Sequence, residues 1–116
     1  MAAGASERLP NAERAIVELR RVRDYLLKPD HPSGGPKSKF FVAYGFTTTD
    51  RDLLRTSLLR HGRTNSVVRH VATEWGIRYT VACNFQTPDG RDPSICSVWQ
   101  MERDVPRLLT VIPARQ

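Results

Sequence analysis

The feature that most constrains the fold is a change of sequence pattern near Gly62. Before it, apolar residues recur at helical spacing; after it, segments rich in β-branched and aromatic residues alternate with turn signals. Helices followed by consecutive strands are typical of an α+β domain. We therefore predict an α+β fold in which N-terminal helices are packed on a four-stranded antiparallel sheet. The predicted strands are Val67–Val71, Ile77–Phe85, Ser94–Met101 and Leu108–Ile112.

The first predicted helix covers Glu18–Leu27, where apolar residues repeat with the helical period. The preceding Ala15–Val17 is either part of this helix or a short strand, because three residues do not reveal a period. A loop follows over Lys28–Pro36, since its three prolines and two glycines disfavour a helix.

Two further helices are predicted before the strands begin. One spans Lys37–Tyr44 and stops at Gly45, which favours the left-handed backbone of a helix C-terminus. The other starts behind an N-cap at Thr48 or Thr49 and ends at Gly62.

The length of 116 residues suits one domain with one core, which we place at residues 9–113 behind a flexible lead of residues 1–8. The N-terminus lacks the apolar run of a signal peptide, and no segment approaches about 20 apolar residues. We therefore expect a cytoplasmic protein with no membrane partner. No metal-ligand spacing or phosphate-binding loop is present, so we expect no cofactor, and nucleotide hydrolysis and acyl transfer are disfavoured.

The two cysteines test the register of the second predicted hairpin. If its centre lies between Asp89 and Gly90, Cys83 and Cys96 are direct cross-strand neighbours. A disulfide would then be geometrically feasible, although cytosolic thiols stay reduced and a buried cysteine behaves as a small apolar residue.

The charge of the chain is strongly positive, with a formal net charge of +6 at pH 7. Residues 33–82 carry eight basic side chains against three acidic ones, which leaves a local charge of +5. If these cations share a face, the partner is a polyanion such as RNA; if they scatter, they form only a solvated surface. The basic residues that we predict to contact nucleic acid are Lys39, Arg51, Arg55 and Arg63.

A series of short motifs runs through nearly the whole chain: Leu9–Ala15, Arg23–Leu27, His31-Pro32, Lys37–Phe41, Gly45-Phe46, Arg63–Asn65, Pro88–Gly90, Val98-Trp99 and Pro106–Thr110. The series resembles an uncharacterised family of small bacterial domains, found alone or at the ends of larger proteins. The family brings no established activity. This chain departs from its usual Thr-Ala-Tyr-Pro ending, because it has Thr110-Val111-Ile112-Pro113.

The order of elements is also similar to the barnase–EndoU–colicin–RelE ribonuclease superfamily, many of whose members are toxins. This resemblance implies RNA cleavage without a metal, for which a proton acceptor, a proton donor and a cation are needed. The chain offers His31 in the loop, Lys37 at a helix start, and Arg107 and Thr110 near the last strand. Because Arg107 and Thr110 are three apart, a regular strand would point them to opposite faces.

We therefore predict a toxin-like, metal-independent ribonuclease or RNA-binding domain, whose partners are RNA and a cognate antitoxin or other acidic protein. The alternative is a non-catalytic interaction module, such as an antitoxin, an immunity protein or an accessory domain. Aromatic residues on or beside the predicted sheet could stack bases if they are exposed, although large aromatic residues in small domains mostly belong to the core; these residues are Trp75, Tyr79, Phe85 and Trp99. His61 and His70, which flank the first strand, are expected at the surface.

Overall fold

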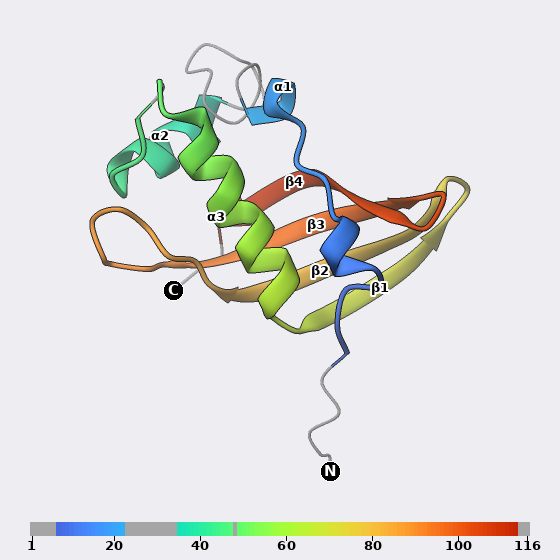
Figure 1. Ribbon diagram of the computed structural model, residues 1–116. Helices are drawn as coiled ribbons and strands as arrows, with labels where there is room; N and C mark the ends of the chain where they lie inside the picture. The colour runs from blue at the N-terminus through green and yellow to red at the C-terminus, as the bar shows by residue number, and fades with distance from the viewer. Residues whose placement is uncertain (1–6, 23–34, 48, 114–116) are drawn as a thin grey trace.

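The computed structural model describes residues 7–22, 35–47 and 49–113, which form a mostly helical first part and a four-stranded sheet (Figure 1). The predicted α+β fold is confirmed, because the helices precede the strands and all neighbouring strands are antiparallel. The elements are η1 (Ala12–Arg14), α1 (Leu19–Arg21), α2 (Gly35–Ala43), α3 (Arg51–Thr64), β1 (Val67–Thr73), β2 (Gly76–Asn84), β3 (Ser94–Glu102) and β4 (Val105–Pro113).

The sheet has the order β1-β2-β3-β4, so each strand pairs with the next one along the chain. All four predicted strands are present, but β4 begins at Val105 rather than Leu108. The cause is the turn before it, where Arg103 and Asp104 both have positive φ, 51° and 65°. Two such residues form the two-residue turn whose twist matches antiparallel strands, and it returns the chain to the sheet at once.

The segment around Ile16 is extended, which bears on both interpretations of Ala15–Val17. The Ile16 amide donates to the Pro106 carbonyl and the Leu108 amide donates to the Ile16 carbonyl, both at 2.9 Å. Ile16 therefore forms a parallel bridge with β4 at Arg107. Ala15–Val17 is therefore extended and not part of the helix, but it forms an isolated bridge and not a strand. Helix α1 starts at Leu19, and the predicted continuation to Leu27 lies outside the described residues.

Helix α2 starts two residues earlier than predicted, at Gly35. Pro36 is compatible with this start, because the first helical turn leaves amides unpaired in any case. The part of the predicted loop before Gly35 lies outside the described residues. The predicted stop is confirmed: Gly45 has φ of +104°, and its amide donates to Val42.

Helix α3 differs from its prediction at both ends. Its N-cap is Asp50, whose carboxylate accepts a hydrogen bond from the Leu53 amide at 3.2 Å, and not one of the preceding threonines. The helix continues through Gly62 to Thr64. Gly62 is needed for close packing, because a Cβ there would lie 2.7 Å from Cε2 of the Trp99 indole.

The hairpin of β2 and β3 has a different register from the predicted one. Cys83 pairs with Ile95, and Ala82 pairs with Cys96. The cysteines therefore point to opposite faces and both are free thiols, so the predicted cross-strand pair is wrong. The reason is the loop between β2 and β3, which runs over residues 85–93 and is centred on Asp89 rather than between Asp89 and Gly90; within it the Thr87 amide and hydroxyl donate to Asp92.

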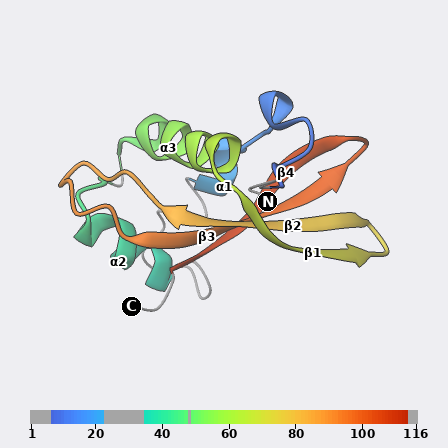
Figure 2. The ribbon, with the colours of Figure 1, turned by 90° about the horizontal axis from the view of Figure 1, so that it is seen from below.

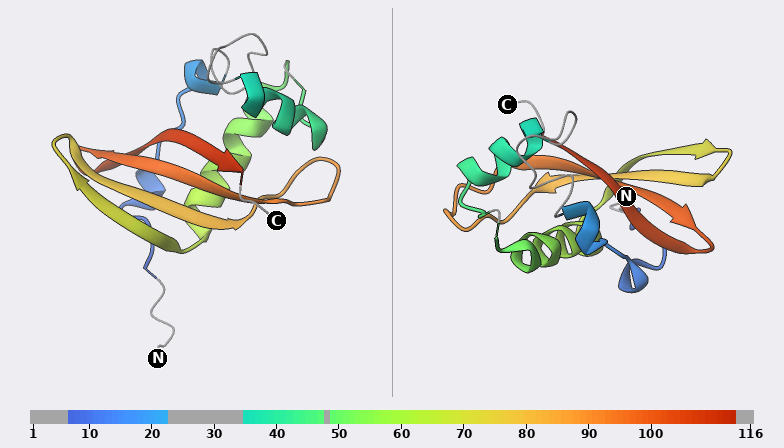
Figure 3. Two further views of the ribbon diagram at one scale, coloured as in Figure 1. Left: turned by 180° about the vertical axis from the view of Figure 1, so that it is seen from behind. Right: turned by 90° about the horizontal axis from the view of Figure 1, so that it is seen from above.

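The core lies between α3 and one face of the sheet (Figure 2). Trp99 and Val81 are fully buried there, and Phe41, Phe46 and Phe85 form an aromatic group at one end. Helix α2 stands at that end, on the other side of the sheet plane from α3 (Figure 3). Among the described residues, no helix covers most of the second face of the sheet.

Candidate functional site

The face of the sheet that points away from α3 carries a shallow depression of about 310 Å³. In β2, Tyr79 and Val81 are buried on the core side of the sheet, so the alternating Arg78 and Thr80 point to this second face. We call it the open face (Figure 3, left). The residues lining the depression are Arg69, Val71, Thr73, Arg78, Thr80, Val98, Leu109, Thr110 and Ile112.

A β-bulge in β4 determines which side chains reach the open face. Thr110 pairs with Val98 and Leu108 pairs with Trp99, so Leu109 is an extra residue without a partner. Arg107 then pairs with Gln100, which is two residues from Val98. Directly opposed residues share a face. Arg107 and Thr110 therefore lie on the same face, and the expectation of opposite faces is wrong.

Two of the predicted catalytic residues meet on the open face. The ammonium group of Lys37, in the first turns of α2, donates a hydrogen bond of 2.8 Å to the hydroxyl of Thr110. The contact joins residues 73 positions apart and is partly buried. A cation near a helix N-terminus opposes the helix dipole, so the Thr110 hydroxyl compensates part of that cost.

The charge of the depression is positive. It is lined by Arg69 and Arg78, and the Nε of Arg78 donates to the Gln100 amide oxygen at 3.3 Å. Within the described part of the chain, no Asp or Glu lines it. With Lys37, which donates to Thr110, this surface presents three cations beside the hydroxyls of Thr80 and Thr110. Such a set of donors suits phosphate oxygens.

Arg107 lies near the hairpin end of the same face, where it is paired with carboxylates. Its guanidinium contacts Glu18 at 3.1 Å and Glu102 at 3.0 Å. The fourth predicted catalytic residue, His31, lies outside the described residues.

The predicted nucleic-acid contacts of α3 lie on other surfaces. Arg55 donates to the Val17 carbonyl at 2.8 Å, and Arg63 donates to the Ala12 carbonyl at 2.9 Å. Both guanidinium groups thus connect the N-terminal segment to α3 by hydrogen bonds. Arg51 begins α3 and is partly buried, while Lys39 is exposed on α2.

Arg69 and Arg78 lie in the positive stretch of residues 33–82, but the net charge of that stretch does not mark them as site residues. A usable signal exists in Arg78-Tyr79-Thr80-Val81, where polar and apolar residues alternate with the period of a strand. That alternation places Arg78 and Thr80 on the face opposite the core.

His61 is a second residue whose position the sequence did not reveal, because it is buried rather than on the surface. Its Nε2 lies 3.1 Å from the Cys83 carbonyl and its Nδ1 lies 2.8 Å from the Ser97 hydroxyl. Burial lowers the pKa of His61 below its usual 6.5, and the hydrogen bond to Cys83 opposes this shift. The ring connects α3 to β2 and β3, so His61 has a structural role. His70 is exposed, as expected.

The family of the chain follows from a match that covers almost its entire length. The model of a family described as a domain of unknown function, DUF6883, matches residues 8–115. The chain belongs to the DUF6883 family. The predicted membership of an uncharacterised domain family is therefore confirmed. No curated protein matches the sequence.

The fold of this DUF6883 domain is shared with a solved structure. A chain of a contact-dependent growth inhibition toxin–immunity protein complex from Klebsiella pneumoniae 342 superposes with a TM-score of 0.70. The match covers 86% of this chain and 100% of that chain, at 16% sequence identity. At this identity the likeness concerns the fold.

The described part of the DUF6883 domain has neither a cluster of metal ligands nor a membrane-spanning helix. Among the residues described, no three His, Cys, Asp or Glu side chains are grouped so that they could hold a metal ion. No helix in the same part of the chain is long and apolar enough to span a membrane. The open face combines a hollow with two arginines and has no carboxylate among its described lining residues.

Proposed function

We propose that the DUF6883 domain acts on RNA as the toxin-like component of a toxin system, and that it holds the RNA backbone on the open face. The observation that carries this proposal is the depression lined by Arg69 and Arg78, rimmed by Lys37, and free of carboxylates among the described residues. Phosphate groups supply most of the affinity of proteins for nucleic acids, and such a surface complements them.

The proposed reaction is cleavage of a phosphodiester. The 2′-oxygen of one nucleotide attacks the adjacent phosphorus and the bond to the 5′-oxygen breaks. One group takes the proton of the 2′-hydroxyl, and another donates a proton to the departing 5′-oxygen. Lys37 is oriented by Thr110 at the edge of the depression and is our candidate proton donor. The arginines stabilise the added negative charge on the phosphorane.

Two further residues complete the proposed mechanism. His31 precedes α2 in the sequence and is the candidate proton acceptor. Arg107 is the candidate additional phosphate contact, and its ion pairs with Glu18 and Glu102 would have to open for this role. The reaction as written uses side chains alone and requires no cofactor.

The toxin-system part of the proposal is supported by the fold. The similar solved chain belongs to a complex of a toxin with an immunity protein. A basic toxin domain is neutralised effectively by an acidic protein that covers the same cations, because the two surfaces then attract each other and the RNA is excluded. An acidic cognate protein that docks on the open face is therefore the proposed protein partner.

The same likeness supports one alternative, a non-catalytic interaction module, since the similar complex contains an immunity protein as well as a toxin. Such a module would bind a protein and leave RNA intact. The two proposals are separated by whether the purified domain cleaves RNA.

The experiment is a cleavage assay on total RNA with a chelator present, comparing the wild type with Lys37→Ala and Thr110→Val. Loss of a positioned proton donor lowers rates by about 100-fold to 10,000-fold, so we expect at least a hundredfold loss in Lys37→Ala. The matched control is Arg14→Ala, which removes one exposed cation from η1, remote from the open face. Intact RNA with the wild type, or equal rates in all variants, would reject the ribonuclease proposal.

A further inference from the structure

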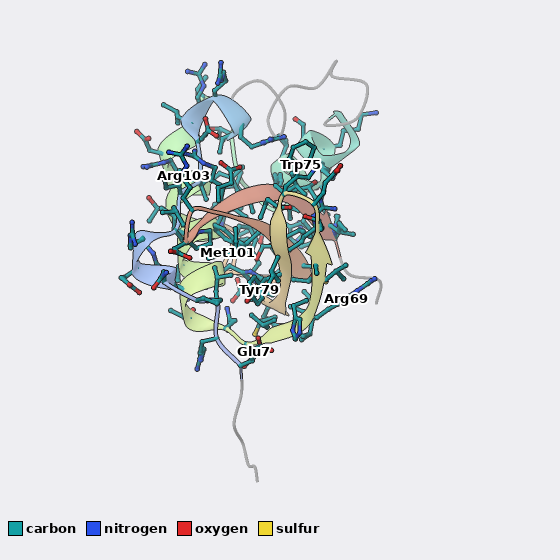
Figure 4. All side chains as sticks on the ribbon, turned by 90° about the vertical axis from the view of Figure 1, so that its right-hand side faces the viewer. Glu7, Arg69, Trp75, Tyr79, Met101 and Arg103 are labelled. Atoms are coloured by element: carbon teal, nitrogen blue, oxygen red, sulfur yellow. The ribbon has the colours of Figure 1, made fainter. Side chains whose placement is uncertain are left out.

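A second hollow, of about 380 Å³, lies at the hairpin end of the sheet, on the side facing the N-terminal segment. Figure 4 looks onto this end, with Trp75 at the tip of the β1–β2 hairpin and Tyr79, Met101 and Arg103 on one side of it. We call this hollow the hairpin pocket. It is lined by Pro10, Asn11, Trp75, Gly76, Ile77, Tyr79, Met101, Arg103 and Asp104.

Trp75 is the unusual member of this set, because its side chain is 72% exposed. The backbone at the tip is fixed, since the Trp75 amide donates to the Thr73 hydroxyl at 3.1 Å and that hydroxyl also contacts the Gly76 carbonyl. An indole on a fixed turn, standing beside a hollow, offers a flat apolar surface for stacking at little cost in conformational freedom.

The charges around the hairpin pocket cancel. Arg103 and Asp104 occupy the adjacent turn and bring one charge of each sign. Asn11 is held against the same turn, because its side-chain amide donates to the Asp104 carbonyl at 2.8 Å. The hollow therefore suits a flat, uncharged group with polar edges rather than a phosphate.

The β1–β2 hairpin connects this pocket with the open face. Arg69 lies on the opposite side of the hairpin from Tyr79 in Figure 4, and Arg78 is three residues from Trp75. At about 3.3 Å per strand residue, the path from Arg78 to the tip is roughly 10 Å. A single-stranded RNA whose phosphates lie on the open face can thus reach the tip of the β1–β2 hairpin within a few nucleotides.

We infer that the hairpin pocket binds one unpaired base of a single-stranded RNA, stacked on the indole of Trp75. The inference rests on the proposed function and adds the class of substrate, because a base inside a duplex is not free to stack on a side chain. Asn11 and Asp104 stand at the rim, where a base presents its hydrogen-bonding edge.

The test is binding of a short single-stranded RNA and of an abasic oligomer of equal length to the wild type, Trp75→Ala and Trp75→Phe. Base stacking on an aromatic residue corresponds to a loss of roughly 5-fold to 150-fold in affinity on replacement by alanine. We expect this loss for Trp75→Ala with the normal RNA, little loss for Trp75→Phe, and no effect of either variant on the abasic oligomer. Leu53→Ala, which removes another exposed apolar side chain, is the matched control.

Fluorescence gives a second readout, because the chain has two tryptophans and Trp99 is 0% exposed. The normal RNA should quench the exposed Trp75, and the abasic oligomer should not. If Trp75→Ala binds the normal RNA like the wild type while Arg78→Gln weakens binding, the hairpin pocket is not a base site and the open-face proposal stands. If the wild type binds no RNA, both the base-site inference and the open-face proposal fail. If Trp75→Ala weakens the binding of a protein partner but not of RNA, the hairpin pocket is a site for that protein and not for a base.

Discussion

Gly62 gives the sharpest test of the packing, because two physical arguments predict opposite signs for Gly62→Ala. Alanine in the interior of a helix is favoured over glycine by about 0.8–1.0 kcal/mol, so propensity alone predicts a more stable protein. In the structure, however, the new Cβ would lie 2.7 Å from Cε2 of Trp99 and closer still to Cζ2. Carbon atoms in good contact are about 3.5–4.0 Å apart, so something must move by about 1 Å.

The indole of Trp99 cannot easily move away from the new methyl group. It is 0% exposed, and its Nε1 donates to the Ser97 hydroxyl at 2.9 Å, which in turn contacts His61. Overpacking typically costs about 1–3 kcal/mol, and this fixed position favours the upper part of that range. After subtracting the gain in helix propensity, we expect Gly62→Ala to lower the free energy of unfolding by about 2 kcal/mol.

Urea denaturation of four proteins measures this effect: the wild type, Gly62→Ala, Trp99→Phe and the double variant. The smaller ring of Trp99→Phe leaves space for the new methyl group, so Gly62→Ala should cost at least about 1 kcal/mol less in that background. A stabilised Gly62→Ala protein would show that α3 does not contact β3 as described. An equal cost in both backgrounds would show that the indole is not the obstacle.

Three further predictions concern stability and can be measured by the same denaturation assay. Because burial lowers the pKa of His61, the unfolded chain binds more protons than the folded protein below about pH 6.5. The contribution of the neutral His61 ring to the free energy of unfolding is therefore complete above that pH and is lost as the pH falls, by at most about 1.4 kcal/mol per pH unit. In a His61→Asn variant, the free energy of unfolding should depend less steeply on pH. Asp50→Ala removes the N-cap of α3 and should cost about 1 kcal/mol, whereas Asp52→Ala, which removes an acid of the same turn, should cost less. Asp104→Gly should stabilise the protein by about 0.5 kcal/mol, because glycine adopts the positive φ of that turn without strain; no gain would contradict the described turn.

The features that could be predicted from the sequence are those that depend on near neighbours. The four strands and the stop at Gly45 follow from local periodicity and local backbone preference, and they are confirmed. The end of α3 could not be predicted in this way. Gly62 has the appearance of a stop signal, and its actual role depends on Trp99, which belongs to a strand on the opposite layer.

The site depends on still more distant contacts. The pair of Lys37 and Thr110 joins α2 to β4, and its geometry relies on the bulge at Leu109, which no local signal marked. Arg55 and Arg63 have the same residue type as Arg69 and Arg78, but their guanidinium groups bind backbone carbonyls of the N-terminal segment. Charge counting along the sequence does not separate these two uses of arginine.

The central claim is that RNA phosphates lie on the open face, and the salt dependence of binding tests it most directly. Affinity for a single-stranded RNA would be measured over a range of salt concentrations for the wild type, for Arg69→Gln/Arg78→Gln, and for Arg14→Gln/Arg60→Gln, which removes the same charge elsewhere. Each phosphate contact of a single strand contributes about 0.7 to the slope of log affinity against log salt. We predict that the slope for the open-face double variant is smaller in magnitude than the wild-type slope by about 1.4, which corresponds to two phosphate contacts, and that the control variant has the wild-type slope. Equal slopes for the wild type and the open-face variant, or an equal loss in the control, would contradict the claim.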